Sequence, residues 1–286
     1  MKVVISADME GTCGVVSWVQ VMPPEVAGSD EPSSTTEYER ARVRMTREVN
    51  AAIEGALAGG AAEVIVNDSH DGMRNLVPEE LHPACRFISG SDKALGMAQG
   101  VDLADVGALF YTGYHAKAGT PAAPLAHTWT GWLNDVRLDG RSVGEFGVNA
   151  VVAGHFGVPV TVISGDDKAV AQTRELLGDQ VVGVAVKEGL STFAALHLHP
   201  DEAQRRIREG AERAARSAKD AKPWMLPPGC RVELEFDHQS RADHAALVPG
   251  VERSGERVIG YQPADGLEFI QLFRAVTKAA SIRMSP

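Results

Sequence analysis

Before about residue 190, short apolar runs alternate with longer segments in which apolar residues recur every three or four positions. The short runs predict buried strands, and the wider spacing predicts helices. We expect strands at 2–7, 62–66, 86–89, 106–112, 136–138, 141–143, 158–164 and 231–236, and helices at 37–58, 147–154, 201–219 and 266–280. This alternation predicts an α/β fold: a mostly parallel sheet flanked by helices on both faces.

Residues that flank the apolar segments mark several boundaries. Ser34-Thr35-Thr36-Glu37 is a capping-box pattern, so a helix should begin near residue 37, and Gly59-Gly60 should end it. The preceding stretch 17–36 is rich in Pro, Ser, Glu and Gly, which predicts a long loop. Asp139-Gly140 lies between two short apolar runs and predicts a hairpin.

The character of the chain changes after about residue 190. A charged helix begins at His199-Pro200-Asp201, prolines follow it, and an alternating strand and a terminal helix complete the chain. We therefore expect an α/β catalytic domain over residues 1–190 and a smaller C-terminal α+β subdomain over residues 191–286.

Composition and charge narrow the class of protein. The chain is 44% hydrophobic and 23% charged, as is common for soluble globular proteins. A net charge of -10 disfavours nucleic acids and anionic membranes as main partners, because these polyanions need a broad basic surface. The chain has three cysteines without a CxxC pair, no secretory signal, and no stretch of about 20 apolar residues. We expect a cytoplasmic protein with neither a nucleic-acid nor a membrane partner.

Four short polar motifs come where apolar strands are expected to end or turn. They are Asp8-Met9-Glu10-Gly11, Asn67-Asp68-Ser69-His70, Gly113-Tyr114-His115 and Gly144-Glu145. In an open parallel α/β sheet, ligands bind outside the carboxyl ends of the strands, so these motifs should converge. Carboxylates mixed with imidazoles suit zinc, manganese or cobalt and are sufficient for a two-metal hydrolytic site.

Each motif alone also has a simpler interpretation. Asp8 and Glu10 would point to one side of an extended strand and repel each other unless a cation or proton intervenes, but acidic pairs also cap helices. The sequence around His70 alone is also consistent with a surface histidine, and that around His115 with a core histidine. Glu145, between apolar residues, needs a partner or a metal if it is buried. The conjunction of all four motifs favours the metal site.

The four motifs, in this order, resemble the M55 family of zinc D-aminopeptidases. The resemblance extends to neighbouring residues: Ser6-Ala7 before Asp8, Ala116 after His115, and Phe146-Gly147-Val148-Asn149 after Glu145. The resemblance covers nearly the whole chain and weakens beyond about residue 190. It implies a peptidase that removes the N-terminal residue of short peptides, including peptides with D-residues. It also implies two zinc ions per subunit that activate a water molecule, and a ring-like homo-oligomer.

The resemblance further implies a role for each motif residue. By motif match, Asp8 would bridge the two zinc ions, with Glu10 and His70 on one ion and His115 and Glu145 on the other. His127, in Leu125-Ala126-His127-Thr128, matches a further family histidine that acts in catalysis. It would donate a hydrogen bond to the oxyanion or move a proton to the leaving amine; the simpler interpretation is a polar loop residue.

Asp166 and Asp167 follow the apolar run 158–164 and are candidates to bind the amino terminus of the substrate. An equally good interpretation is that this pair caps the next helix.

Two features depart from the family pattern. Ser191 is followed by Thr192-Phe193, where the family often has a basic residue, and the stretch 17–36 is particular to this chain. Two other functions stay open: a two-metal phosphoesterase, and a non-catalytic oligomeric protein that binds metal or peptide. The scarcity of Lys and Arg beside the motifs argues against the first, and the complete set of candidate residues argues against the second.

Overall fold

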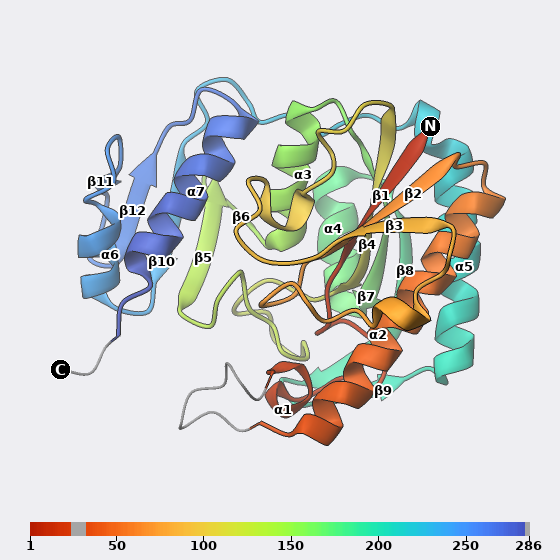
Figure 1. Ribbon diagram of the computed structural model, residues 1–286. Helices are drawn as coiled ribbons and strands as arrows, with labels where there is room; N and C mark the ends of the chain where they lie inside the picture. Colours follow the sequence, from red (N-terminus) through yellow and green to blue (C-terminus); the bar gives the residue numbers. More distant parts are fainter. Residues whose placement is uncertain (24–32, 284–286) are drawn as a thin grey trace.

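Two β-sheets organise the chain, and the larger one is almost wholly parallel (Figure 1). The computed structural model describes residues 1–23 and 33–283. In the larger sheet, only β9 runs antiparallel to its neighbour. Its strands, in sheet order, are β3 (Cys85–Ile88), β2 (Glu63–Asp68), β1 (Lys2–Ala7), β4 (Val106–Tyr114), β7 (Val160–Asp166), β8 (Val182–Ser191) and β9 (Ala194–His197). The predicted α/β fold is confirmed.

Helices cover both faces of this sheet because successive residues of each strand point to opposite sides. In β1, Val3 and Ile5 pack on the side of α2 (Thr35–Ala58) and α5 (Pro200–Ser217), which lie against each other. Val4 packs on the opposite side, which is covered by α3 (Glu145–His155) and α4 (Asp167–Leu177). The near-continuous apolar sequence of β1 follows from burial on both faces. No helix among the described residues has the length and apolar character needed to cross a membrane.

The smaller sheet is antiparallel and, with its helices, forms an α+β subdomain beside α3 (Figure 1, mostly blue). The predicted hairpin is present there: Asp139 and Gly140 have φ of 49° and 77°, the left-handed conformations of a tight hairpin turn. The elements are β11 (Glu252–Arg253), β12 (Val258–Tyr261), β10 (Val232–Phe236), β5 (Leu133–Leu138), β6 (Arg141–Val143), α6 (Gln239–Ala245) and α7 (Gly266–Ala280). Three 3-10 turns complete the described elements: η1 (Pro78–Glu80), η2 (Gly96–Ala98) and η3 (Ala218–Asp220).

The predicted division into residues 1–190 and 191–286 stays a prediction, and the two sheets draw on both sides of that boundary. β5 and β6 precede residue 190 but pair in the smaller sheet. β9 follows it but pairs in the larger sheet, and α5 packs on that sheet with its apolar stripe of Ala203, Ile207 and Ala211 buried. The charged residues of α5 lie on its solvent-exposed face.

The stretch 17–36 was expected to be a loop, but part of it is helical. α1 (Trp18–Val21) is a single turn, and the Gln20 side chain accepts hydrogen bonds from the N–H groups of Val16 and Ser17 at 2.7 and 3.2 Å. Ser34 caps α2, in line with the capping-box pattern, and accepts a hydrogen bond from the Glu37 N–H at 3.4 Å; the helix begins at Thr35, two residues before the expected start. Residues 24–32 of this stretch lie outside the described residues.

Glycines allow β1, β4 and β7 to approach closely at their carboxyl ends. A Cβ atom on Gly165 would lie 1.9 Å from the carbonyl oxygen of Tyr114, and one on Gly11 would lie 1.8 Å from the same atom. No side chain fits at either distance, so the close approach depends on glycine.

We predict that Gly165→Ala lowers the free energy of unfolding by at least about 2 kcal/mol, because the new methyl group collides with backbone. Urea denaturation would measure it. The control is Gly72→Ala, where the nearest heavy atom to the new Cβ is a flexible Arg74 nitrogen at 3.7 Å, and the expected change is within about 0.5 kcal/mol. Equal stability of the two variants would contradict the prediction.

Candidate metal centre

Six residues singled out in the sequence meet at the carboxyl edge of the larger sheet. Asp8 and Glu10 follow β1, His70 follows β2, and His115 follows β4. Glu145 is the first residue of α3, and His127 lies in the segment between β4 and β5. All are buried except His127, whose side chain is 16% exposed. The structure therefore brings together residues that are up to 137 positions apart, from Asp8 to Glu145.

His70 faces the carboxylates of β1. Its Nδ1 lies 3.0 Å from Glu10 Oε2 and 3.3 Å from Asp8 Oδ1. Its other nitrogen, Nε2, lies 2.8 Å from the carbonyl oxygen of Val21. A carbonyl only accepts hydrogen bonds, so the ring proton belongs on Nε2, and Nδ1 turns its lone pair towards the carboxylates.

His115 repeats this arrangement on the other side of Asp8. Its Nε2 lies 3.4 Å from both Asp8 Oδ2 and Glu145 Oε1, and its Nδ1 lies 3.0 Å from the carbonyl oxygen of Ala116. Asp8 thus directs one carboxylate oxygen to His70 and the other to His115. This is the placement that a carboxylate bridging two cations requires.

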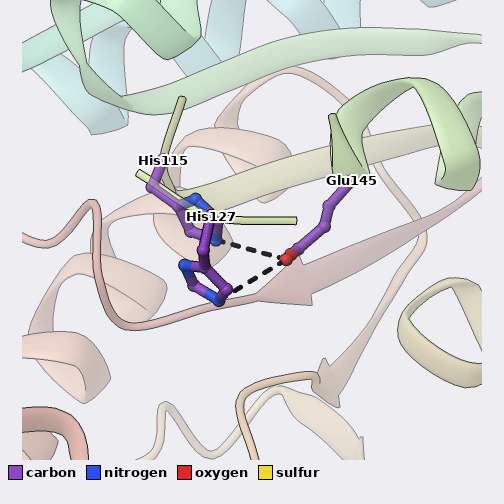
Figure 2. Close-up of side chains that lie close together, drawn as sticks. All are labelled: His115, His127 and Glu145. Atoms are coloured by element: carbon purple, nitrogen blue, oxygen red, sulfur yellow. Dashed lines mark ion pairs between the residues drawn. The ribbon is translucent and has the colours of Figure 1, made fainter. Parts of the chain in front are cut away.

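His127 stacks on His115, with ring centroids 4.1 Å apart and planes 10° from parallel (Figure 2). Its Nε2 lies 3.7 Å from Glu145 Oε1 and 4.0 Å from Glu10 Oε1, while its Nδ1 lies 2.9 Å from the carbonyl oxygen of Leu125. His127 therefore also has one nitrogen fixed by the backbone and the other facing the carboxylates.

The donor atoms of these residues fit two divalent cations. They form two triplets, in each of which the ligand atoms lie within 4.8 Å of one another: Asp8, Glu10 and His70, and His115, His127 and Glu145. Asp8 Oδ2 and Glu10 Oε2 are buried and accept no hydrogen bond from any residue that the structure describes. Buried carboxylate oxygens without donors are costly, and a cation removes that cost. Carboxylate and imidazole ligands, oriented by backbone carbonyls, suit zinc.

The pKa values show how strongly the site favours positive charge. Burial, reinforced by the charge of Glu10, raises the pKa of Asp8 to about 7. Burial alone would lower the pKa of His115, but Glu145, Asp8 and Glu10 outweigh it and raise that pKa to about 10. Burial and the neighbouring His115 lower the pKa of His127. Without a cation, His115 is protonated near neutral pH and His127 is not.

Trp129 orients Glu145 and was not expected from the sequence. Its backbone N–H donates a hydrogen bond to Glu145 Oε1 at 2.7 Å. The residue has φ of 67°, a left-handed conformation that is uncommon for a bulky side chain. Its ring contacts Phe273 of α7 edge to face at 5.0 Å, which ties the metal centre to the smaller subdomain. No sequence pattern around Thr128 predicts this backbone conformation.

A cavity of about 620 Å³ opens beside the carboxylates and imidazoles. Its size is within the range of small-molecule sites and suits a short peptide. The wall away from the metal ligands is largely apolar and is formed by Trp18, Val21, Met22, Met73, Met97 and Trp129. These residues come from separate segments that only the fold brings together, so no sequence pattern predicts the wall.

Asp166 and Asp167, the expected binders of the substrate amino terminus, are not among the residues that line this cavity. Asp166 accepts hydrogen bonds from the N–H groups of Lys168 and Ala169 at 2.9 Å and of Ala116 at 3.1 Å. Asp167 is engaged by Lys168 and by the Gly189 N–H. The geometry does not support their expected role. Asp166 instead caps α4 and anchors the backbone next to His115, because its carboxylate meets three amide donors.

Comparison with known proteins agrees with this geometry. The model of the family described as Peptidase M55, D-aminopeptidase, matches residues 1–275. A D-aminopeptidase of Bacillus subtilis (strain 168) is 37% identical over 281 residues, which cover 98% of each chain. The solved structure of the Zn-dependent D-aminopeptidase DppA from Bacillus subtilis, described as a self-compartmentalizing protease, superimposes with a TM-score of 0.90, 34% identity and full coverage of both chains.

These similarities confirm the family predicted from the four motifs. They also confirm the predicted class of enzyme, a metal-dependent aminopeptidase. The chain belongs to the M55 family of D-aminopeptidases.

Proposed function

We propose that the protein removes the N-terminal residue of short peptides by hydrolysis at a two-zinc site. The observation that carries the proposal is the common orientation of His70, His115 and His127. Each is held through one nitrogen by a backbone carbonyl and turns the other towards buried carboxylates. The zinc dependence of the Bacillus subtilis relative supports the choice of metal.

In this proposal Glu10 and His70 would hold one ion, His115 and Glu145 would hold the other, and Asp8 would contact both. Bound zinc supplies Lewis acidity, which lowers the pKa of a water molecule and polarises the scissile carbonyl. Because the three carboxylates do not fully balance two divalent ions, the site stays electrophilic. The cavity beside it holds the peptide, and the apolar wall excludes water from the substrate.

His127 is the proposed catalytic residue. Its Nδ1 is fixed on the Leu125 carbonyl oxygen, so Nε2 is the nitrogen left to exchange a proton in the cavity. Its lowered pKa keeps it neutral near pH 7, and a neutral imidazole is able to accept a proton. We assign it the acceptance of a proton from the attacking water molecule and the transfer of that proton to the leaving amine.

Substrate stereochemistry, assembly and location complete the proposal. The family description and the relative support peptides with an N-terminal D-residue. The self-compartmentalizing relative supports a ring-like homo-oligomer of this chain. The free thiols of Cys13, Cys85 and Cys230 agree with a reducing compartment, and we propose the cytoplasm.

The proposed activity predicts release of free alanine from D-Ala dipeptides by zinc-loaded protein, measured against matched L-Ala dipeptides. A chelator should abolish the release, and added zinc should restore it, because the ions supply the Lewis acid. Faster release from the L-dipeptide would reject the proposed stereochemistry alone. Release that persists after complete zinc removal would reject the metal-dependent mechanism.

Asp8→Ala is predicted to remove both zinc ions, because Asp8 directs one oxygen to His70 and the other to His115. Metal analysis of the purified protein would count the zinc ions per chain. Asp71→Ala is the control, since Asp71 lines the same cavity but belongs to neither ligand triplet, and it should keep both ions. An Asp8→Ala protein with two tightly bound zinc ions would rule out the bridging role.

His127→Ala is predicted to lower kcat by about 10²–10⁴-fold, the usual contribution of a general acid or base, while both zinc ions remain bound. Steady-state kinetics and metal analysis on the same preparation test both parts. Loss of one zinc ion would instead make His127 a ligand of the triplet that it forms with His115 and Glu145.

A further inference from the structure

A buried hydrogen-bond network is formed by residues close to the proposed metal ligands in the sequence and contains none of those ligands. Its central group is the hydroxyl of Tyr114, a side chain with no exposed surface. This hydroxyl lies 2.7 Å from Ser6 Oγ and accepts a hydrogen bond from Asn149 Nδ2 at 2.9 Å. Ser6 Oγ in turn lies 2.9 Å from Ser69 Oγ and donates to the Met97 carbonyl oxygen at 2.7 Å.

The hydrogen bonds of this network run in one donor-to-acceptor order, from the Asn149 amide through Tyr114 and Ser6 to the Met97 carbonyl oxygen. The Asn149 amide only donates through Nδ2, so the Tyr114 oxygen is an acceptor there and its proton is available for Ser6. Ser6 donates its own proton to the Met97 carbonyl oxygen, which only accepts. A side chain without the tyrosine hydroxyl breaks this chain in its middle.

Each side chain of the network is close in sequence to a proposed zinc ligand. Ser69 immediately precedes His70, and Tyr114 immediately precedes His115. Ser6 is two residues before Asp8, and Asn149 is one helical turn after Glu145 in α3. The network therefore joins all the ligand-bearing segments: the ends of β1, β2 and β4, and the first turns of α3.

The sheet ladder shifts register at the end of β4, although Tyr114 still pairs with Gly165 of β7. The pairing of β4 with β7 is irregular between Tyr111 and Tyr114, and Gly113 has φ of 67°. As a result Tyr111 and Tyr114, three residues apart, lie on the same side of the sheet and stack at 4.2 Å. Three positions along a regular strand would place them on opposite faces. Asp166 anchors the Ala116 N–H on one side of His115, and the Tyr114 hydroxyl adds a side-chain constraint on the other side.

We propose that the Tyr114 hydroxyl is a positioning group that sets the relative placement of the two zinc sites. It does so by fixing His115 and α3, which carry one ligand pair, to β1 and β2, which carry the other. The inference rests on the ligand assignment of the proposed function. Tyr114 is not among the cavity-lining residues, so it acts through the ligands and not on the substrate.

The test compares Tyr114→Phe with Tyr111→Phe. Tyr111 is a matched control: it lies in the same strand, is equally buried, and stacks on Tyr114, but its hydroxyl donates only to the backbone carbonyl of Phe146 at 3.0 Å. Zinc affinity is measured by competition with a chelator. The visible absorption spectrum of cobalt-substituted protein reports the coordination geometry.

Groups that orient metal ligands usually contribute 10–100-fold to metal affinity, so Tyr114→Phe should bind zinc at least about 10-fold more weakly. Its cobalt spectrum should differ from that of the wild type. Tyr111→Phe should keep the wild-type spectrum and stay within about threefold of the wild-type affinity, because the network stays intact. Adding Asn149→Ala to Tyr114→Phe should cause little further loss, since both changes break the same chain.

Melting temperatures of the metal-free proteins separate positioning from stability. A Tyr114→Phe protein that melts at a lower temperature but keeps the wild-type zinc affinity and cobalt spectrum would overturn the inference and leave the proposed function intact. Equal losses of zinc affinity in the two tyrosine variants would also overturn it. Wild-type protein that binds no zinc would refute the proposed function itself, and this inference with it.

Discussion

This structure depends on one constraint: three carboxylates are buried together beside a group of histidines. Asp8, Glu10 and Glu145 repel one another in a region that water does not solvate, so they stay together only with positive charge between them. In the protein alone, protons on His70 and His115 supply it, and the pKa of both imidazoles is raised accordingly. A site that holds protons this strongly also suits divalent cations, because each imidazole turns inwards the nitrogen that becomes a metal ligand once its proton leaves.

The fold satisfies this constraint by ending several strands at one edge. Parallel strands bring their carboxyl ends together regardless of separation in the sequence, and glycines at positions 11, 113 and 165 let those ends approach within backbone contact. The same geometry places the ligands on segments without regular pairing, where the sheet no longer determines their positions. Side-chain hydrogen bonds, backbone carbonyls and the left-handed Trp129 then orient them. The polar network thus connects the same segments that carry the candidate ligands.

The meeting of the candidate ligands at one edge of the sheet was predictable from the sequence, because each motif depends on local features. The apolar run 2–7 and the acidic motif after it locate β1 and its carboxyl end, and the terminal helix 266–280 has the predicted bounds. Non-local features were not predictable. The sheet to which the hairpin β5–β6 belongs depends on pairing with β10, almost 100 residues later. α1 is one turn, too short for periodicity to show, and the capping role of Asp166 depends on the distant Ala116 amide. The apolar cavity wall is a product of packing between segments.

His115 and His127 show how small differences in placement separate a ligand from a proton carrier. The two rings stack almost parallel, and each is fixed through Nδ1 by a backbone carbonyl. His115 Nε2 lies 3.4 Å from the carboxylates of Asp8 and Glu145, and these charges raise its pKa. His127 Nε2 lies farther from its carboxylates, 3.7 Å from Glu145 and 4.0 Å from Glu10. Its pKa is lowered because burial and the charge of His115 dominate. A cation in place of the His115 proton would keep positive charge beside His127 and so keep it neutral. The stacked pair therefore holds one imidazole ready to bind metal and the other ready to accept a proton.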